Sequence, residues 1–134
     1  MDNFYGRSVF FVKEAEDALA FYTQKLGFTL DWNHQVEGRA FVLQVSLYGF
    51  ELILNQIEGW TKDRAGHGRV FIGLEESQVA ALRKHISTRD IKAAFFHWGN
   101  PTLVIKDLDG NELFFWLPQS EWASLEALPP LPAG

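Results

Sequence analysis

The chain has 134 residues, which is enough for one compact domain or for two small modules that share a core. Its 12 basic and 17 acidic residues give a net charge of -5, so we expect no basic surface for nucleic acid or an anionic membrane. The absence of cysteine excludes disulfides, thiolate metal sites and cysteine nucleophiles. With no apolar run as long as a membrane span and no signal-peptide layout, we expect a soluble, cytoplasmic protein.

The first half of the chain has the pattern of a strand, a helix and three strands. Residues 8–12 are β-branched and aromatic, which predicts a buried strand. Apolar residues then recur at helical spacing from Ala15 to Leu26, and Gly27 is placed to end that helix. The three strands are predicted at residues 28–32, 40–47 and 50–55, and Tyr48-Gly49 forms the turn between the last two.

The second half repeats this order after a polar, glycine-containing stretch. A strand is predicted at residues 69–74, followed by a helix with Ser77 as its N-cap. Asp109-Gly110-Asn111 supplies the turn between the last two strands, and the tail is expected to hold a short helix before a loose, proline-rich end. The remaining strands are predicted at residues 91–98, 102–106 and 112–117, and the tail helix between residues 120 and 128.

The repeated order of elements predicts the architecture. Aligning Arg7 with Arg69 superposes the two halves. We therefore expect an α+β fold of two βαβββ modules, whose sheets join into one curved mixed sheet with helices outside and a cleft inside. The expected single domain, residues 1–134, consists of a first module at about 6–57, a linker at 58–68, a second module at about 69–118 and a tail at 119–134.

Several motifs resemble the vicinal oxygen chelate superfamily, which includes glyoxalase I, extradiol dioxygenases, fosfomycin-resistance enzymes and bleomycin-resistance proteins. The resemblance covers roughly residues 7 to 118, and it implies the paired-module fold. Because this fold hosts many chemistries, it does not define the reaction. The motifs are Val9-Phe10-Phe11-Val12, Ala18-Leu19-Ala20-Phe21-Tyr22, Lys25-Leu26-Gly27-Phe28, Trp98-Gly99 and Asp107-Leu108-Asp109-Gly110-Asn111.

The same resemblance implies where a metal would bind. Metal-dependent members place His, Gln or Glu on the first and the last strand of each module. The corresponding positions here are Arg7, Glu51, Arg69 and Phe114, of which only Glu51 carries a donor for a metal. We therefore expect no metal cofactor, and we favour a protein that is not an enzyme.

Strand alternation predicts which side chains face the cleft. Glu51 is expected between Arg7 and Arg69 in an internal ion cluster, while one of the two arginines could remain free for a carboxylate or phosphate. The opposite faces are uniformly apolar and suit packing beneath the helices. The predicted cleft residues are Arg7, Val9, Phe11, Glu51, Ile53, Asn55, Arg69, Phe71, Gly73, Glu112, Phe114 and Trp116.

Five tryptophans in so short a chain indicate that some face a ligand or a partner. Trp116 is the best candidate ligand contact, Trp98 lies at the rim or in the core, and Trp32 lies at the cleft mouth. Trp60 could serve a lid or a dimer contact, and Trp122 is expected to dock on the protein's own surface. The predicted ligand-binding residues are Arg7, Phe11, Trp32, Glu51, Ile53, Trp60, Arg69, Phe71, Trp98, Phe114 and Trp116.

The four histidines form no metal constellation in the sequence. His67 and His97 lie near predicted cleft positions, where either is a candidate for chemistry, and His34 and His85 are expected at the surface.

The resemblance is strongest to the bleomycin-resistance branch, whose members lack the metal ligands, sequester a drug and work as homodimers with shared clefts. We expect a non-catalytic binder of an aromatic or cationic small molecule such as a bleomycin-type antibiotic. The acidic charge suits a cationic planar ligand, whereas the two arginines suit an anionic group. The alternatives are a metal-dependent lyase, isomerase or dioxygenase with a site around Glu51 and His67 or His97, and a dimeric interaction module.

Overall fold

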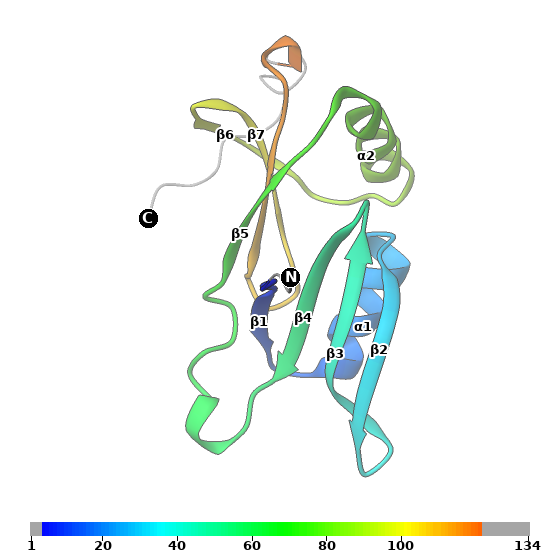
Figure 1. The fold of residues 1–134 in the computed structure, drawn as a ribbon, viewed down its shortest axis with the longest axis vertical. Coiled ribbons are helices and arrows are strands. Elements are labelled where there is room, and N and C mark those ends of the chain that lie inside the picture. Colours follow the sequence, from blue (N-terminus) through cyan, green and yellow to red (C-terminus); the bar gives the residue numbers. More distant parts are fainter. Residues whose placement is uncertain (1–3, 122–134) are drawn as a thin grey trace.

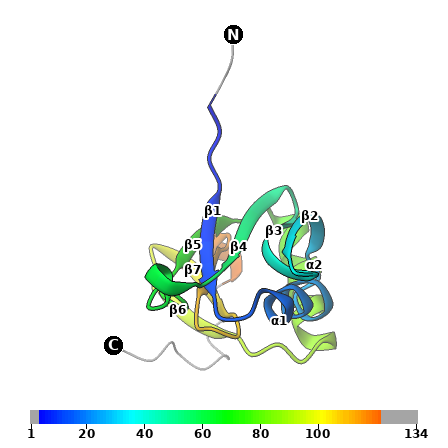
Figure 2. The ribbon, with the colours of Figure 1, turned by 90° about the horizontal axis from the view of Figure 1, so that it is seen from below.

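A computed structural model of the chain describes residues 4–121, apart from the side chains of residues 97, 98 and 121. The expected tail helix extends beyond this range, and Trp122 and the proline-rich end lie outside the described residues. Figure 1 shows two groups of strands with one helix beside each, and Figure 2 shows both helices on the same side of the molecule. No helix within residues 4–121 is long and apolar enough to cross a membrane.

The first module is a four-stranded mixed sheet backed by one helix. Its strand order is β1-β4-β3-β2, with β1 parallel to β4 and the other neighbours antiparallel. The helix α1 continues directly into one π-helical turn. The elements are β1 (Ser8–Val12), α1 (Ala15–Ala20), the π-helical turn (Phe21–Lys25), β2 (Thr29–Val36), β3 (Arg39–Leu47) and β4 (Phe50–Gln56).

The second module repeats this plan with strand order β5-β8-β7-β6. The prediction of an α+β fold built from two βαβββ modules is therefore confirmed. Short 3-10 turns lie in the linker (Gly59–Thr61) and after the last strand (Gln119–Glu121). The elements are β5 (Arg69–Gly73), α2 (Glu76–Thr88), β6 (Ala94–Trp98), β7 (Asn100–Lys106) and β8 (Glu112–Trp116).

The strand ladders form two separate sheets within residues 4–121, where the sequence predicted one continuous sheet. The reason lies at the open edge of β1. There the carbonyl oxygen of Phe11 accepts hydrogen bonds from the backbone N–H of Gly66 (3.3 Å) and from the side-chain amide of Asn111 (3.0 Å). A linker residue and a side chain thus occupy the edge on which a ladder to the second module would form.

The helix α1 and its π-helical turn form because one face of this segment is apolar. Ala15, Ala18, Tyr22 and Leu26 are all at most 4% exposed, and they pack on the sheet. Gly27 ends the segment at φ +80°, a backbone conformation that favours glycine, as the sequence predicted.

The second helix begins slightly earlier than predicted. Its N-cap is Glu75 rather than Ser77, because Glu75 and Gln78 form a reciprocal capping box. His85, expected at the surface, is half-buried, and its Nε2 lies 2.7 Å from the carbonyl oxygen of Lys25. This contact and a hydrogen bond from Arg89 to the carbonyl of Gln24 connect α2 to the π-helical turn of the first module.

The two modules also meet in a buried polar group that we call the junction cluster: Tyr22, Asp107 and Asn111. The hydroxyl of Tyr22 donates to Asp107 (2.9 Å), and Asn111, which is 0% exposed, donates to Asp107 and accepts from the N–H of Gly68 (2.8 Å). Burial raises the pKa of the Asp107 carboxyl, although its hydrogen bonds favour the ionised form. Burial, followed by the charge of Asp107, raises the pKa of Tyr22. The Asp107–Asn111 turn therefore holds the second module against the first.

Candidate functional site

Each sheet has a second face, turned away from the helices, which we call its inner face. In β1, Phe10 is 2% exposed on the helix side, whereas Val9 is 44% exposed on the inner side. In β5, Ile72 and Phe71 show the same contrast, at 8% and 50%. Large apolar side chains are therefore open to solvent on both inner faces, as strand alternation predicted.

Charged residues on the inner faces form two separate pairs. Arg7 donates to Glu51 (3.1 Å) at the edge of the first sheet, and the hydrogen bond to Glu51 raises the pKa of Arg7. Arg69 pairs with Glu112 (2.8 Å) on the second sheet. The predicted cluster with Glu51 between Arg7 and Arg69 is therefore wrong, because Arg69 has a carboxylate opposite it on its own neighbouring strand.

The aromatic residues of the second sheet are layered. Phe114 is 0% exposed, because the guanidinium of Arg69 lies 4.2 Å from its ring centre and Phe96 packs against it at 5.7 Å. Phe71 and Trp116 lie further along, with ring centres 5.5 Å apart, and Phe71 is half exposed. Of the aromatics predicted on β5 and β8, Phe71 and Trp116 can be reached from solvent, and Phe114 lies beneath Arg69.

The residues at the four superfamily metal positions do not fit a metal. Arg7 and Arg69 are cations without a free lone pair, and Phe114 has no donor atom. The remaining residue, Glu51, already accepts hydrogen bonds from Arg7 and Gln44. Within the described residues, no group of three His, Asp or Glu side chains could hold a metal ion.

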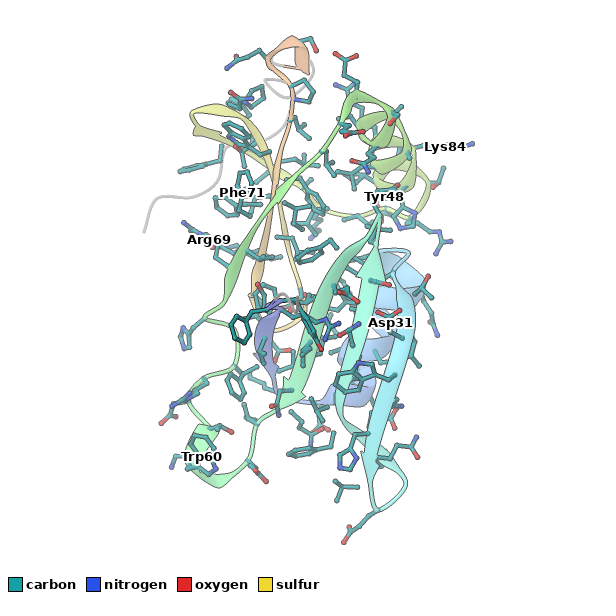
Figure 3. The ribbon with its side chains drawn as sticks, viewed as in Figure 1. Asp31, Tyr48, Trp60, Arg69, Phe71 and Lys84 are labelled. Carbon is teal, nitrogen blue, oxygen red and sulfur yellow. The ribbon has the colours of Figure 1, made fainter. Side chains whose placement is uncertain are left out.

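At the far end of β1, the linker residue Arg64 lies beside two aromatic rings, one from the linker and one from β1. The guanidinium of Arg64 lies 5.6 Å from the ring centre of Phe11 and 5.2 Å from that of Trp60. Trp60 is 76% exposed, so it projects from the linker rather than packing in the core (Figure 3). This arrangement brings two of the predicted ligand-binding residues, Phe11 and Trp60, to one cation.

A polar network on the first inner face was missed by sequence reasoning. The side-chain amide of Gln44 donates to Asp31 (2.8 Å) and to Glu51 (3.1 Å), and the hydroxyl of Ser46 donates to Asp31 (2.9 Å). Asp31 lies at a β-bulge between Leu30 and Trp32, which changes the register of β2 against β3. The alternation that places Gln44 and Ser46 on one face of β3 was a usable signal, but the bulge at Asp31, which shifts the pairing of β2 with β3, was not visible in the sequence.

The other predicted residues are placed as follows. Trp32 is 41% exposed and pairs with Gln44 across β2 and β3, and Ile53 pairs with Gln44 from β4. His34 and His67 are exposed. The side chains of His97 and Trp98 lie outside the described residues.

Three hollows of about 310 to 380 Å³ lie near the helices and the module junction. Phe21 and Lys25 line two of them, and His85 lines the third. None of these three is lined by the inner-face pairs or by Phe71 and Trp116, so the hollows and the inner faces are different surfaces.

Known proteins share this fold. The sequence pattern of the Glyoxalase/Bleomycin resistance protein/Dioxygenase superfamily matches residues 5–115. The antibiotic-binding protein TnmS3 from Streptomyces sp. CB03234 superposes with a TM-score of 0.62 at 20% identity, over 88% of this chain and 99% of that one. A search of curated protein sequences finds no match.

Two further structures show how widely the fold is used. The bleomycin-binding protein from Streptomyces verticillus, complexed with copper(II)-bleomycin, gives a TM-score of 0.65 at 18% identity, over 88% of this chain and 99% of that one. Lactoylglutathione lyase from Agrobacterium tumefaciens gives a TM-score of 0.62 at 14% identity, over 89% of this chain and 96% of that one. Binding proteins and an enzyme therefore share this architecture, so the function must be argued from the residues.

Proposed function

Because the chain belongs to the Glyoxalase/Bleomycin resistance protein/Dioxygenase superfamily, we propose that it binds a small organic molecule without transforming it. The ligand is an aromatic or cationic compound, such as a bleomycin-type antibiotic, which the protein sequesters. The structural neighbours TnmS3 and the Streptomyces verticillus protein, which bind an antibiotic and bleomycin respectively, support this choice.

The observation that carries the proposal is the aromatic pair Phe71–Trp116 on the inner face of the second sheet. The two rings lie at 52° to each other with centres 5.5 Å apart, and they provide a stacking surface for a planar group. Beside them, Arg69 and Glu112 offer polar groups that could orient a ligand.

The alternative is a metal-dependent lyase, isomerase or dioxygenase. Arg7, Arg69 and Phe114 at the superfamily metal positions weigh against it, because two guanidinium groups repel a divalent ion. Metal analysis after dialysis distinguishes the two: one divalent ion retained per chain would favour the enzyme.

We expect planar aromatic ligands, with bleomycin as the first probe, to quench the intrinsic tryptophan fluorescence. Trp116→Ala should raise the Kd by about tenfold, because a central aromatic contact is removed. Tyr48→Ala is the matched control, since Tyr48 is 45% exposed on the β3–β4 turn, away from Phe71 (Figure 3), and it should leave the Kd unchanged. If no compound in a broad panel changes the fluorescence, the dimeric interaction module becomes the better explanation.

We also propose that two copies associate as a homodimer whose inner faces form shared clefts. The chain before β1 projects from the rest of the molecule (Figure 2), and it carries Phe4 and Tyr5, which are 105% and 78% exposed. Together with the open inner faces, these side chains present apolar surface that a second copy would bury.

Sedimentation should accordingly give a mass near twice the 15.3 kDa of one chain. Val9→Arg, which places a charge on the inner face of β1, should shift the protein toward monomer. Val36→Arg should not, although Val36 is similarly exposed at 49%, because it lies at the β2–β3 turn. A wild-type protein that stays monomeric at high concentration would refute the dimer.

A further inference from the structure

We propose that the hollow between α2 and the first module binds a small aliphatic carboxylate. We call this hollow the Arg89 pocket. Its volume is about 340 Å³, which lies within the range of small-molecule sites in proteins. Because the pocket is separate from the inner faces, it is a second site that can be tested independently of the proposed ligand-binding function.

Both modules contribute to the walls of the Arg89 pocket. Leu26, Gly27 and Leu47 come from the first module, and Ala81 and Leu82 come from α2. Leu26 and Leu82 are each 4% exposed and belong to the buried core, so the walls are held by close packing on either side. The apolar part of the pocket is therefore mainly aliphatic, in contrast to the aromatic surface of the inner faces.

Two polar side chains of α2 and its C-cap are fixed at the pocket by backbone carbonyls of the first module. His85 Nε2 lies 2.7 Å from the carbonyl oxygen of Lys25, and a Cβ built at Gly27 would come within 2.7 Å of the His85 ring. The guanidinium of Arg89 donates from Nη1 to the carbonyl oxygen of Gln24. Because both side chains are anchored before a ligand arrives, binding requires less loss of side-chain freedom.

The charge of Arg89 is not compensated by a carboxylate. The ion pairs within residues 4–121 involve Arg7 and Arg69, so Arg89 has no acidic partner in this part of the chain. No acidic side chain of the described residues lines the pocket either. A guanidinium has five N–H donors, and the contact with Gln24 requires one N–H but no charge. The remaining donors and the positive charge are therefore available to an anion.

A carboxylate with a saturated hydrocarbon body matches both parts of the pocket. The planar guanidinium presents paired N–H donors in the geometry that suits two carboxylate oxygens. The leucines provide an apolar surface for a saturated ring or chain. A cationic ligand would be repelled by Arg89, and a neutral amide of the same shape would keep the apolar contacts without the ion pair.

The test compares three probes that share one saturated ring: cyclohexanecarboxylate, neutral cyclohexanecarboxamide and cationic cyclohexylmethylamine. A saturated ring does not stack as a planar ligand does, so these probes disfavour the Phe71–Trp116 pair. Titrations at neutral pH are followed by NMR through the ring signals of His85. We expect the carboxylate to bind about five-fold more tightly than the amide, the upper range for one exposed ion pair, and the amine to bind most weakly.

Arg89→Gln should abolish the preference for the carboxylate and leave the affinity for the amide unchanged. Lys84→Gln is the matched control, because it removes one positive charge from the same helix. Lys84 points away from the molecule (Figure 3) and does not line the pocket, so this variant should retain the preference.

Ala81→Phe should weaken the binding of the carboxylate and the amide alike, because the added ring would occupy the pocket. Ala80→Phe is its matched control, since Ala80 is the preceding residue on α2 and does not line the pocket. Both alanines are exposed, so both variants should fold, and Arg89→Gln tests the proposal without filling the pocket.

Four results would overturn the Arg89 pocket as a carboxylate site. They are an absence of carboxylate binding, equal binding of the carboxylate and the amide to the wild type, a preference that survives in Arg89→Gln, and undiminished binding to Ala81→Phe. None of them affects the ligand site on the inner face, which the tryptophan fluorescence experiment tests separately.

Discussion

Gly66→Ala is expected to lower the free energy of unfolding by about 3 to 5 kcal/mol, among the largest effects of a single substitution. Gly66 has φ +84°, and a Cβ built there would lie 2.1 Å from the backbone carbonyl oxygen of Asp109. Because the contact is with backbone, it can be relieved only by moving the linker away from the Asp107–Asn111 turn. Urea denaturation followed by circular dichroism measures the loss.

Gly38→Ala separates the effect of the close contact from the effect of the backbone conformation. Gly38 has φ +78°, and a Cβ there meets nothing within 4 Å. Gly38→Ala should therefore lower the free energy of unfolding by about 1 to 2 kcal/mol, the cost of a left-handed conformation for alanine. Equal losses in the two variants would show that the linker is not packed against the turn as described.

Asn111→Ala should destabilise the protein by about 3 kcal/mol. Asn111 is 0% exposed. The substitution removes three hydrogen bonds of its side chain, which accepts from the N–H of Gly68 (2.8 Å) and donates to the Phe11 carbonyl (3.0 Å) and to Asp107 (3.0 Å). The N–H of Gly68 would be left without its acceptor, and a polar group that loses its partner costs more free energy than the hydrogen bond contributed. Thermal and urea unfolding measure the change.

The matched control for this variant is Asn55→Ala. Asn55 is half-buried, and its side chain makes one local hydrogen bond, to the carbonyl of Gln56. Its removal should cost less than about 1 kcal/mol. A loss in Asn111→Ala no larger than this would contradict the role assigned to the junction cluster.

Local chemistry made most of the fold predictable. The strand at residues 8–12 has the predicted bounds, and Tyr48-Gly49 forms the predicted turn, because both depend on nearby residues. The edge of β1 was not predictable, since whether a strand or a side chain occupies it depends on Asn111, one hundred residues away. Long-range pairing of this kind leaves no periodic signal in the sequence.

The sequence predicted which side chains of the candidate site lie on the inner faces, but not which residues they pair with. Alternation placed Arg7, Glu51, Arg69 and Phe71 on the inner faces, yet it could not show that Arg69 pairs with Glu112. The role of Asp31 was hidden for a different reason. A β-bulge interrupts the period of two between Leu30 and Trp32, so Trp32 pairs with Gln44 on the face that Asp31 also contacts, although alternation would place these two neighbours on opposite faces.

The junction cluster also constrains the order in which the chain can complete its fold during synthesis. The hydroxyl of Tyr22 and the carbonyl of Phe11 obtain their partners from residues that follow them by 85 and 100 positions. Until Asp107 and Asn111 have left the ribosome, the first module carries the Tyr22 hydroxyl without its native acceptor and the Phe11 carbonyl without its hydrogen bond from Asn111. While only the amino-terminal half has been synthesised, a chaperone could therefore engage the chain. Cutting the chain at the linker would leave each half without hydrogen-bond partners that the other half supplies.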